Sequence, residues 1–351
     1  MVVDKKGSLQ SLDHLPELRQ DFVRGDWILL AKARRLRPHQ LQHARIVPIA
    51  SKSSCPFEDP QKSTNGPPLL WFSAPSHKRD SKALFKNWFL QIVKNKYPAL
   101  THHLKNCPLL LRDGIYTKMS GMGFHEVIIT RPHARSLAHF SIKEAELVIR
   151  AYQKRIQDLF KERCLQYILI FQNHREEAGA SVFHPHSQLM ALPIIPPDVG
   201  RSLDGSQKFY HKYGKCAHCL IVSQELTQKV RVVYKNKSFI VLAPYASHTS
   251  FELRIFPLKH QARFEKISVR DRAFCADALT TALRKLYKGL KNPPYNFFIH
   301  TAPRNIKRFK HYHWHIEILP KMSKLAGVEL GTGIEIIAIS PEEAAEYLRK
   351  R

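Results

Sequence analysis

The 351-residue sequence has no run of about 18 uncharged apolar residues, which is the length that a membrane-spanning helix requires. Its first residues also lack the apolar segment of a secretory signal peptide. Glycine-rich patterns that bind phosphates or dinucleotides are absent, and so is the G-x-S-x-G pattern of serine hydrolases. We therefore expect a cytoplasmic protein without membrane-spanning helices. The sequence gives no support to the P-loop, dinucleotide-binding or serine hydrolase classes.

Cysteine is scarce, with six residues in the chain. Six cysteines in a chain of this length do not form the disulfide framework of a small secreted protein, so we expect a reducing compartment. Cys216 and Cys219 form the one C-x-x-C pair. In an intracellular protein that spacing indicates metal or redox chemistry.

Acidic residues are few, with 29 Asp and Glu against 56 Lys and Arg and a formal net charge of +27. A field of this sign attracts nucleotides, nucleic acids and anionic membrane surfaces. The basic residues are scattered and form only short clusters, such as residues 32–37 and 307–310. We therefore favour the steering of phosphorylated substrates over direct nucleic-acid binding, although charge alone decides little.

What the chain does contain is an internal repeat. Residues 124–141 (FHEVIITRPHARSLAHFS) correspond to residues 251–268 (FELRIFPLKHQARFEKIS), 127 positions later. The alignment pairs His133 with His260 and Ser141 with Ser268. With 44% apolar residues and this length, the composition is that of a globular protein with two domains of ordinary size.

The agreement between the halves continues beyond these segments. In each half an apolar strand-like run is followed by an amphipathic helical pattern, then by a β-branched and aromatic run, and then by a His-x-His motif. The helical patterns cover residues 142–159 and 269–290, the later strands begin at 167 and 295, and the motifs are 184–186 and 313–315. This order predicts two related α+β units.

A polar stretch rich in Pro, Gly and Asp, residues 196–212, is the natural junction between the two units. We place the domain boundary within it, so that the N-terminal domain comprises residues 1–203 and the C-terminal domain residues 204–351.

The repeat also predicts a metal site in the second half, formed by Cys216, Cys219, His260 and His313. Two thiolates and two imidazoles are the Cys2His2 set that suits tetrahedral Zn²⁺. The alternative is a pair of ordinary buried cysteines. His315 either replaces His313 as the ligand or faces the substrate, and the sequence does not separate these options.

The equivalent set in the first half is Cys55, Glu58, His133 and His184. A carboxylate takes the place of the second thiolate. Glutamate can bind zinc, but one fewer soft ligand weakens this site, and Glu58 can equally be a solvated turn residue beside Asp59.

The densest group of reactive side chains lies between residues 171 and 196. His184, Pro185 and His186 place two imidazoles on one strand face. If His184 binds the metal, His186 is free to attack phosphorus as a neutral imidazole. Gln188 lies on the same face and can donate to developing phosphate charge. Further neutral donors in this stretch are Asn173, Ser181 and the loop around Gly179.

Several motifs together resemble the galactose-1-phosphate uridylyltransferase family of the histidine-triad superfamily. They occur in the family's order: the opening stretch 17–38, NKYPAL at 95–100, GFHEVIITRPH, the HPHSQ run, HWHIEILP and LAGVELGTG. The resemblance covers nearly the whole chain. It implies a tandem pair of histidine-triad-like units, each an antiparallel sheet with helices on one face, related by a pseudo-twofold axis.

The resemblance also implies a ping-pong reaction on a nucleotide sugar and a sugar 1-phosphate, with a nucleoside monophosphate carried on His186. Gln188 and Ser181 then hold the transferred phosphoryl group. The remaining substrate-binding residues that it implies are Arg34, Arg37, Asn95, Asn173, Gly327 and Glu329. Relatives form homodimers with residues of both chains near the sugar, so we expect a dimer.

Three departures from the family pattern favour altered specificity: Glu58 in place of a cysteine, Arg175 in place of a glycine, and Ile337 in place of an asparagine. The C-x-x-C pair resembles the branch with two zinc sites, which includes adenylyl-transferring phosphorylases. We expect uridylyl transfer between hexose 1-phosphates, with ADP-glucose phosphorolysis as the runner-up. A non-catalytic, basic nucleic-acid-binding protein is the alternative of a different class.

Overall fold

A computed structural model describes residues 15–36, 48–63, 66–75, 87–102, 107–305, 309 and 311–351. The elements of the first half are β1 (Glu17–Gln20), β2 (Trp27–Leu30), η2 (Lys32–Leu36), β3 (Leu70–Ser73), β4 (Trp88–Lys94), β5 (Leu111–Asp113), β6 (Tyr116–Lys118), β7 (Phe124–Thr130), η3 (Leu137–His139), α1 (Ile142–Leu159), β8 (Tyr167–His174), η4 (Glu176–Ala178) and β9 (His186–Leu192). Those that follow are α2 (Pro197–Tyr213), α3 (Ala217–Gln228), β10 (Val232–Lys235), β11 (Phe239–Leu242), β12 (Leu253–Pro257), η5 (Phe264–Lys266), α4 (Val269–Gly289), β13 (Tyr295–His300), β14 (His315–Pro320), α5 (Gly327–Thr332), β15 (Glu335–Ile337) and α6 (Pro341–Arg349).

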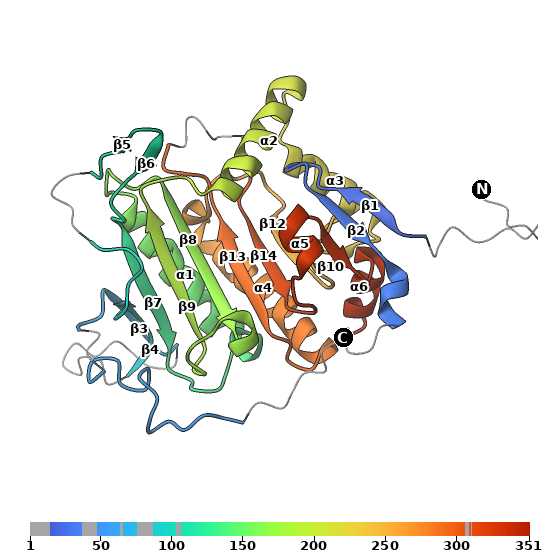
Figure 1. The fold of residues 1–351 in the computed structure, drawn as a ribbon. Coiled ribbons are helices and arrows are strands. Elements are labelled where there is room, and N and C mark those ends of the chain that lie inside the picture. Colours follow the sequence, from blue (N-terminus) through green and yellow to red (C-terminus); the bar gives the residue numbers. More distant parts are fainter. Residues whose placement is uncertain are drawn as a thin grey trace, which may run out of the picture.

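A ten-stranded sheet runs through the molecule in the order β10-β11-β12-β14-β13-β8-β9-β7-β4-β3 (Figure 1). Every neighbouring pair in it is antiparallel. The two halves meet where β8 pairs with β13, and the strands on either side follow in matching order. The expected pair of α+β units is confirmed, but their sheets are joined edge to edge into one.

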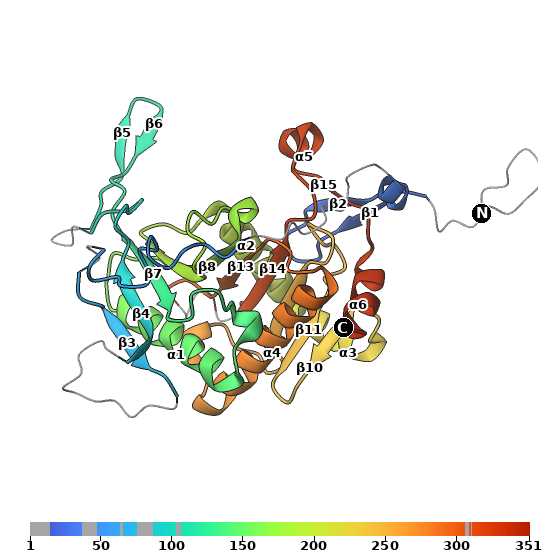
Figure 2. The same cartoon turned by 90° about the horizontal axis from the view of Figure 1, so that it is seen from below.

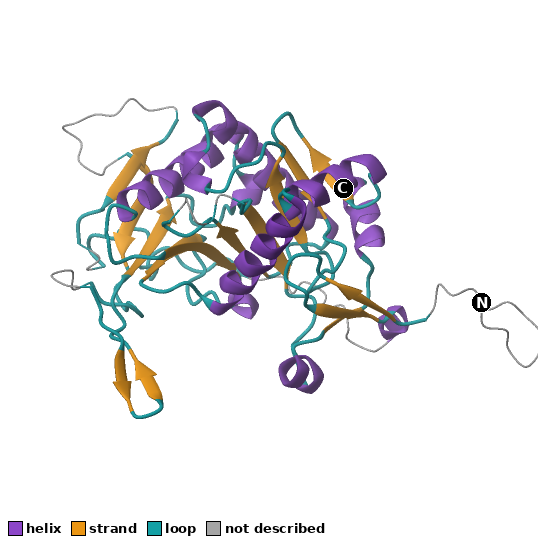
Figure 3. Cartoon of the chain, turned by 90° about the horizontal axis from the view of Figure 1, so that it is seen from above, coloured by secondary structure: helices purple, strands orange, loops and turns teal. Residues whose placement is uncertain are grey.

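Helices α1 and α4 cover one face of this sheet, as Figures 2 and 3 show from two sides. Along β8 and β9, Ile168, Ile170, Leu189 and Ala191 point to that face and belong to the main apolar core. Burying each such leucine or isoleucine contributes about 1.5–3 kcal/mol. Because side chains alternate along a strand, the even-numbered residues of β9, including His186, point to the opposite face.

The repeat predicted from sequence appears in the way both long helices begin. Ser141 and Ser268 cap α1 and α4, each accepting a hydrogen bond from the backbone N–H three residues later. An N-cap of this kind stabilises a helix by about 1 kcal/mol. The helices expected at 142–159 and 269–290 are confirmed, the second ending one residue earlier than expected.

Residues 196–212, the predicted junction between the two units, connect β9 to α3 but are not an open loop. This stretch forms helix α2, with Pro197 at its first position, and the boundary drawn between residues 203 and 204 falls inside it. Val199 and Leu203 are buried against Tyr167 and Tyr312. Packing of this apolar face outweighs the weak helix propensity of the glycines and aspartates.

A disulfide joins Cys107 and Cys164, which sequence reasoning did not anticipate. It links the segment before β5 to the turn after α1. The four other cysteines have free thiols. The cysteines of both expected metal groups, Cys55 in the first half and Cys216 and Cys219 in the second, are therefore free to bind metal.

Two small elements project from the sheet face opposite α1 and α4: the β5–β6 hairpin and helix α5 (Figure 2). The hairpin and its approach expose large apolar side chains, with Leu109 75%, Ile115 90% and Tyr116 73% exposed. On α5, Val328 and Leu330 are exposed as well. Among the described residues, no helix has both the length and the apolar character needed to cross a membrane.

Candidate active site and metal groups

His186 opens strand β9 and lies on the sheet face that α1 and α4 leave uncovered. Its Nδ1 is 2.9 Å from the carbonyl oxygen of His184, which can only accept a hydrogen bond. Nδ1 therefore carries the ring hydrogen, and Nε2 keeps its lone pair. Burial lowers the pKa of the His186 imidazole, so the neutral form is favoured. Phe57 packs edge-on against the ring at 5.0 Å.

Gln188, two residues along the same face, contacts a histidine that sequence reasoning missed. Its Oε1 lies 2.8 Å from Nε2 of His125 on the neighbouring strand β7. His125 in turn meets the segment that begins at Asn95: the Ala99 N–H donates to Nδ1 over 3.1 Å, and the Asn95 backbone N–H donates to the His125 carbonyl over 2.9 Å. The structure thus brings Asn95 and Gln188 to the same histidine. In the sequence, His125 stood out only as part of the motif GFHEV. The pairing of β7 with β9 places its side chain on the same sheet face as that of Gln188.

The loop between β8 and β9 carries the other donors expected near the phosphate. The Asn173 side chain accepts a hydrogen bond from Asn296 over 2.8 Å and donates to the Gly179 carbonyl over 3.3 Å, so it holds the loop in shape. Ser181 is exposed in the same loop. Arg175 adopts a φ of 72°, a strained conformation for a residue with a side chain, and its Nη1 donates to the Asn292 carbonyl.

The first metal group gathers Cys55, Glu58, His133 and His184, whose ligand atoms all lie within 4.8 Å of one another. Each imidazole donates its Nε2–H to a backbone carbonyl: His184 to that of Thr130 over 2.6 Å, and His133 to that of Ala50 over 2.8 Å. The Nδ1 lone pairs consequently face the Glu58 carboxylate, at 2.8 Å from His133 and 3.5 Å from His184. Electron-rich atoms converging in this way fit a bound cation.

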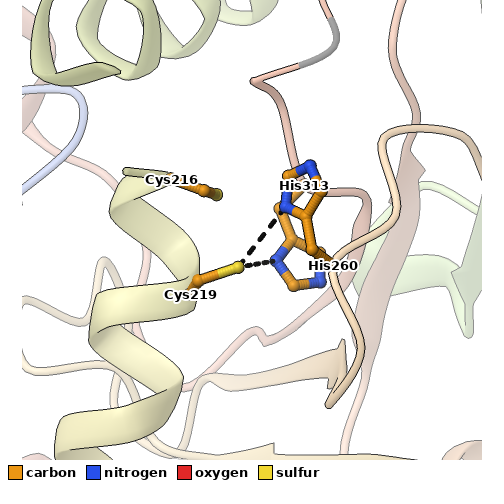
Figure 4. A group of neighbouring side chains, drawn as sticks. All are labelled: Cys216, Cys219, His260 and His313. Carbon is orange, nitrogen blue, oxygen red and sulfur yellow. Dashed lines mark hydrogen bonds between the residues drawn. The ribbon is translucent and has the colours of Figure 1, made fainter. Parts of the chain in front are cut away.

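The second metal group gathers Cys216, Cys219, His260 and His313 (Figure 4). The Cys219 Sγ lies 3.3 Å from Nδ1 of His260 and 3.5 Å from Nδ1 of His313. A hydrogen bond from Cys219, together with the neighbouring imidazoles, holds the pKa of the Cys216 thiol far below its usual range. A thiolate is the form that binds metal, so the donor set fits Zn²⁺.

Of the two histidines that the sequence left open, His313 lies beside the cysteines and His315 lies outside that group. His315 is 3% exposed and stacks on Phe256 at 5.0 Å. Its Nε2 lies 3.4 Å from Glu317, and Glu317 also pairs with Arg254 at 3.2 Å. In the repeat His315 and Glu317 take the places of His186 and Gln188, but here helix α3 packs on the same sheet face through Val222. In the second half, helix α3 therefore covers the sheet face whose counterpart in the first half carries His186.

The remaining expected substrate residues are not brought to His186 within this chain. Arg34 lies in η2 after β2, while Gly327 and Glu329 lie in α5, which is followed by β15. β1, β2 and β15 form a separate sheet at the flank of the C-terminal half, away from β9 (Figure 1). Arg37 falls outside the described residues. Ile337 is 2% exposed in β15 and packs with Leu30, so it is a core residue here.

Comparison with known proteins identifies the family of this chain. A family model of the galactose-1-phosphate uridyl transferase N-terminal domain matches residues 7–196. The chain belongs to the galactose-1-phosphate uridylyltransferase family. Its relatives include the ADP-glucose phosphorylase of Arabidopsis thaliana, to which it is 33% identical over 95% of this chain and 93% of the relative. The galactose-1-phosphate uridylyltransferase of Thermotoga maritima is 28% identical over 95% of this chain and 98% of the relative.

Solved structures of the family have the same fold. A crystal structure of an ADP-glucose phosphorylase from Arabidopsis thaliana with bound ADP-glucose superposes with a TM-score of 0.79 at 31% identity, covering 96% of this chain and 99% of that one. A uridylyltransferase mutant superposes with a TM-score of 0.70 at 27% identity, covering 95% and 98%. The uridylyltransferase family thus includes both kinds of enzyme among the proteins that this chain resembles.

Proposed function

We propose that the protein transfers a nucleoside monophosphate from a nucleotide sugar through a covalent intermediate on His186. The Nε2 lone pair attacks the phosphorus next to the nucleoside, and a P–N bond forms. The bond from that phosphorus to the bridging oxygen breaks, and the sugar 1-phosphate leaves with this oxygen. The hydrogen bond from Nδ1 to the His184 carbonyl stabilises the positive ring that results.

An incoming phosphate oxygen then attacks the same phosphorus, the P–N bond breaks, and neutral His186 is restored. If the acceptor is inorganic phosphate, the product is a nucleoside diphosphate and the reaction is phosphorolysis. If the acceptor is a hexose 1-phosphate, the product is a second nucleotide sugar. The observation that supports the mechanism is the free Nε2 on a buried, neutral imidazole beside Gln188.

Between these acceptors we favour phosphorolysis of ADP-glucose or a similar nucleotide sugar, which reverses the order expected from sequence. The support is the higher identity to the Arabidopsis thaliana phosphorylase, 33% against 28% for the uridylyltransferase of Thermotoga maritima, together with the TM-score of 0.79 to a phosphorylase structure. Uridylyl transfer between hexose 1-phosphates stays the second candidate.

The roles of the surrounding residues follow from their chemistry. Gln188 and Ser181 donate hydrogen bonds to the transferred phosphoryl group, and Asn95 orients the nucleotide. Asn173 contributes by fixing the loop that carries Ser181. Arg34 and Arg37 neutralise the diphosphate.

We also propose that both metal groups bind Zn²⁺. The second group ties the start of α3 to the loops that follow β12 and precede β14, and the first ties the turn at Cys55 to the start of β9. A bound ion in the first group holds His184, two residues before the nucleophile, and so fixes the backbone that accepts the His186 hydrogen bond. Its contribution is to position the strand.

A homodimer completes the site in this proposal. Arg34, Gly327 and Glu329 lie at the flank beyond β14, separated from His186 within one chain. The exposed hairpin and α5 project from the sheet face opposite α1 and α4, which suits contact with a second copy (Figure 2). Strand alternation places His186 on that same face. A partner then supplies the flank residues to each nucleophile.

Product assays discriminate the candidates. The purified protein is incubated with ADP-glucose or UDP-glucose, each with phosphate or galactose 1-phosphate, and the sugar phosphates and nucleotides are quantified. We expect glucose 1-phosphate and ADP from ADP-glucose with phosphate. UDP-galactose from UDP-glucose with galactose 1-phosphate would establish the second candidate. No turnover with any pair, accompanied by tight, salt-sensitive RNA or DNA binding, would favour the nucleic-acid-binding alternative.

A further inference from the structure

We infer that His125 is a positioning residue that couples the nucleotide-binding turn to Gln188 and so to the phosphorus at His186. The inference rests on the proposed function, and it assigns a role to a residue to which neither the resemblance nor the proposed mechanism gave one. His125 belongs to the GFHEVIITRPH motif, but the resemblance gives it no role. The inference is carried by the hydrogen-bond geometry on both sides of its imidazole ring.

The tautomer of His125 is fixed by its neighbours. The Ala99 backbone N–H is a donor under all conditions, and it points at Nδ1 over 3.1 Å. Nδ1 therefore has the lone pair, and the hydrogen of the neutral ring is on Nε2. That hydrogen points to Gln188 Oε1, 2.8 Å away, which accepts it.

Asn95 does not compete for this hydrogen. Its Oδ1 accepts the Tyr97 backbone N–H over 2.9 Å, which fixes the orientation of the amide. Its Nδ2 lies 3.1 Å from His125 Nε2, but both are donors, so Gln188 receives the ring hydrogen. Asn95 keeps its own amide hydrogens for an acceptor outside this group.

The consequence falls on Gln188. An isolated glutamine side chain can turn either its oxygen or its nitrogen toward a phosphate, and only the nitrogen stabilises negative charge. With Oε1 held by His125, the Gln188 amide N–H2 is directed away from β7. In the β7–β9 register His125 lies opposite Met190, which places it diagonally to Gln188. Both side chains are on the same face of the sheet, so they can reach each other.

The same ring connects this amide to the turn that holds the nucleotide. Residues 95–99 contact His125 through the Asn95 backbone and the Ala99 N–H. When a base and ribose settle on this turn, the turn, His125 and Gln188 are fixed together. Binding of the correct nucleoside thus orders the donor that acts on the transferred phosphate.

Three variants test this relay. His125→Phe keeps the ring and removes both hydrogen bonds, while His125→Gln can accept from Ala99 through its oxygen and donate to Gln188 through its nitrogen. Gln188→Ala removes the residue on which His125 acts. The matched control is His102→Ala, which removes an exposed imidazole that contacts Phe124, the residue before His125.

The rate of nucleotide attachment to His186 is measured by rapid quench with ADP-glucose and with UDP-glucose. We expect His125→Phe to lower this rate by about 10- to 100-fold, His125→Gln to restore part of it, and His102→Ala to leave it unchanged. The double variant His125→Phe with Gln188→Ala should be no slower than Gln188→Ala alone, since His125 acts through Gln188. Losses that multiply in the double variant would overturn the proposal.

A measurement that needs no turnover separates this proposal from the proposed function. In ¹⁵N-labelled wild-type protein, the His125 resonances, assigned by their loss in His125→Phe, report which ring nitrogen is protonated. We expect hydrogen on Nε2. Hydrogen on Nδ1 would overturn the relay even in an active enzyme, whereas Nε2 protonation in a protein that forms no adduct would leave the relay standing and remove the proposed function.

Discussion

His184 and His186 stand one residue apart on the same strand face, and the backbone around them gives their rings opposite tasks. His184 donates Nε2–H to the Thr130 carbonyl and turns Nδ1 toward Cys55, 3.5 Å away. His186 donates Nδ1–H to the His184 carbonyl and leaves Nε2 free. One backbone carbonyl for each ring therefore separates the proposed metal ligand from the proposed nucleophile.

His174 gives a prediction about stability and pH. Burial lowers the pKa of the His174 imidazole to about 4, and the nearby Arg175 and His139 lower it further. The hydrogen bond to Asn292 and the charge of Glu177 partly offset this by raising the pKa. Because the unfolded chain binds the proton near pH 6.5, stability is complete above that pH and is lost as the pH falls toward 4. The difference in pKa corresponds to about 3 kcal/mol.

Urea unfolding at pH 7, 5.5 and 4 checks this. His174→Gln keeps a donor for Asn292 but does not titrate. Between pH 7 and pH 4 its free energy of unfolding should therefore fall by less than that of the wild type, and the difference should reach up to about 3 kcal/mol. His211→Gln, which removes an exposed imidazole on α2, is the control. Parallel curves for wild type and His174→Gln would show that His174 does not contribute.

The metal groups give a second prediction. We expect two zinc ions per chain by elemental mass spectrometry, one in Cys219→Ser and one in Glu58→Gln, with a lower melting temperature in both because metal binding stabilises the folded chain. Asp59→Asn, beside Glu58 but outside the metal group, should keep both ions. Full zinc content in Glu58→Gln would mean that the first group holds its ion without the carboxylate, or that zinc binds elsewhere.

Among the elements, helix α2 depends on a close approach that one glycine permits. A Cβ at Gly205 would lie 1.8 Å from the carbonyl oxygen of Val23, so the helix and the β1–β2 turn would have to separate. At Gly200, on the same helix, a Cβ meets nothing within 4 Å. The two glycines thus give a matched pair.

Gly205→Ala should destabilise the protein by about 1–3 kcal/mol through overpacking, measured by thermal and urea unfolding. Gly200→Ala should raise stability by up to about 1 kcal/mol, because alanine is the better helix former. An equal effect of the two substitutions would contradict the proposed contact between α2 and Val23.

The elements also show where sequence reasoning succeeds. Helices α1 and α4 were predicted within one residue because their apolar periodicity and their serine caps are local signals. Helix α2 was missed because its local signals are those of a loop, and only packing against Tyr167 and Tyr312 makes it a helix. The Cys107–Cys164 disulfide was missed because a pairing across 57 residues has no local trace.

The candidate site divides in the same way. The metal groups could be predicted because the repeat aligns His133 with His260 and His184 with His313. His125 could not, since its role depends on the register of β7 against β9 and on the turn at Ala99, which only the folded chain brings together.

At the scale of the whole molecule, two similar halves form one sheet and differ in what covers the face opposite α1 and α4. In the C-terminal half α3 packs on that face, and Glu317, the counterpart of Gln188, pairs with both Arg254 and His315. In the N-terminal half that face carries His186 and Gln188, and the proposed function places the substrate there. The formal net charge of +27 agrees with the steering of anionic substrates to one such proposed site per chain.

The proposed dimer is testable at this scale. We expect light scattering after size-exclusion chromatography to give twice the chain mass of 40.6 kDa. Ile115→Glu places a charge on the exposed hairpin and should weaken the dimer and lower activity together, because the flank residues then no longer reach the partner's His186. Lys235→Glu, a charge change on the far edge strand β10, is the control. A fully active monomer would show that one chain contains the complete site.

The central claim is the covalent nucleotide on His186, and intact-protein mass spectrometry tests it most directly. Wild type and His186→Ala are incubated with ADP-glucose and then with UDP-glucose, and quenched at alkaline pH to preserve the phosphoramidate. The proposed mechanism predicts a nucleoside monophosphate adduct on the wild type alone, larger with ADP-glucose. A folded, zinc-loaded wild type that neither donor labels, or an adduct that persists in His186→Ala, would contradict it.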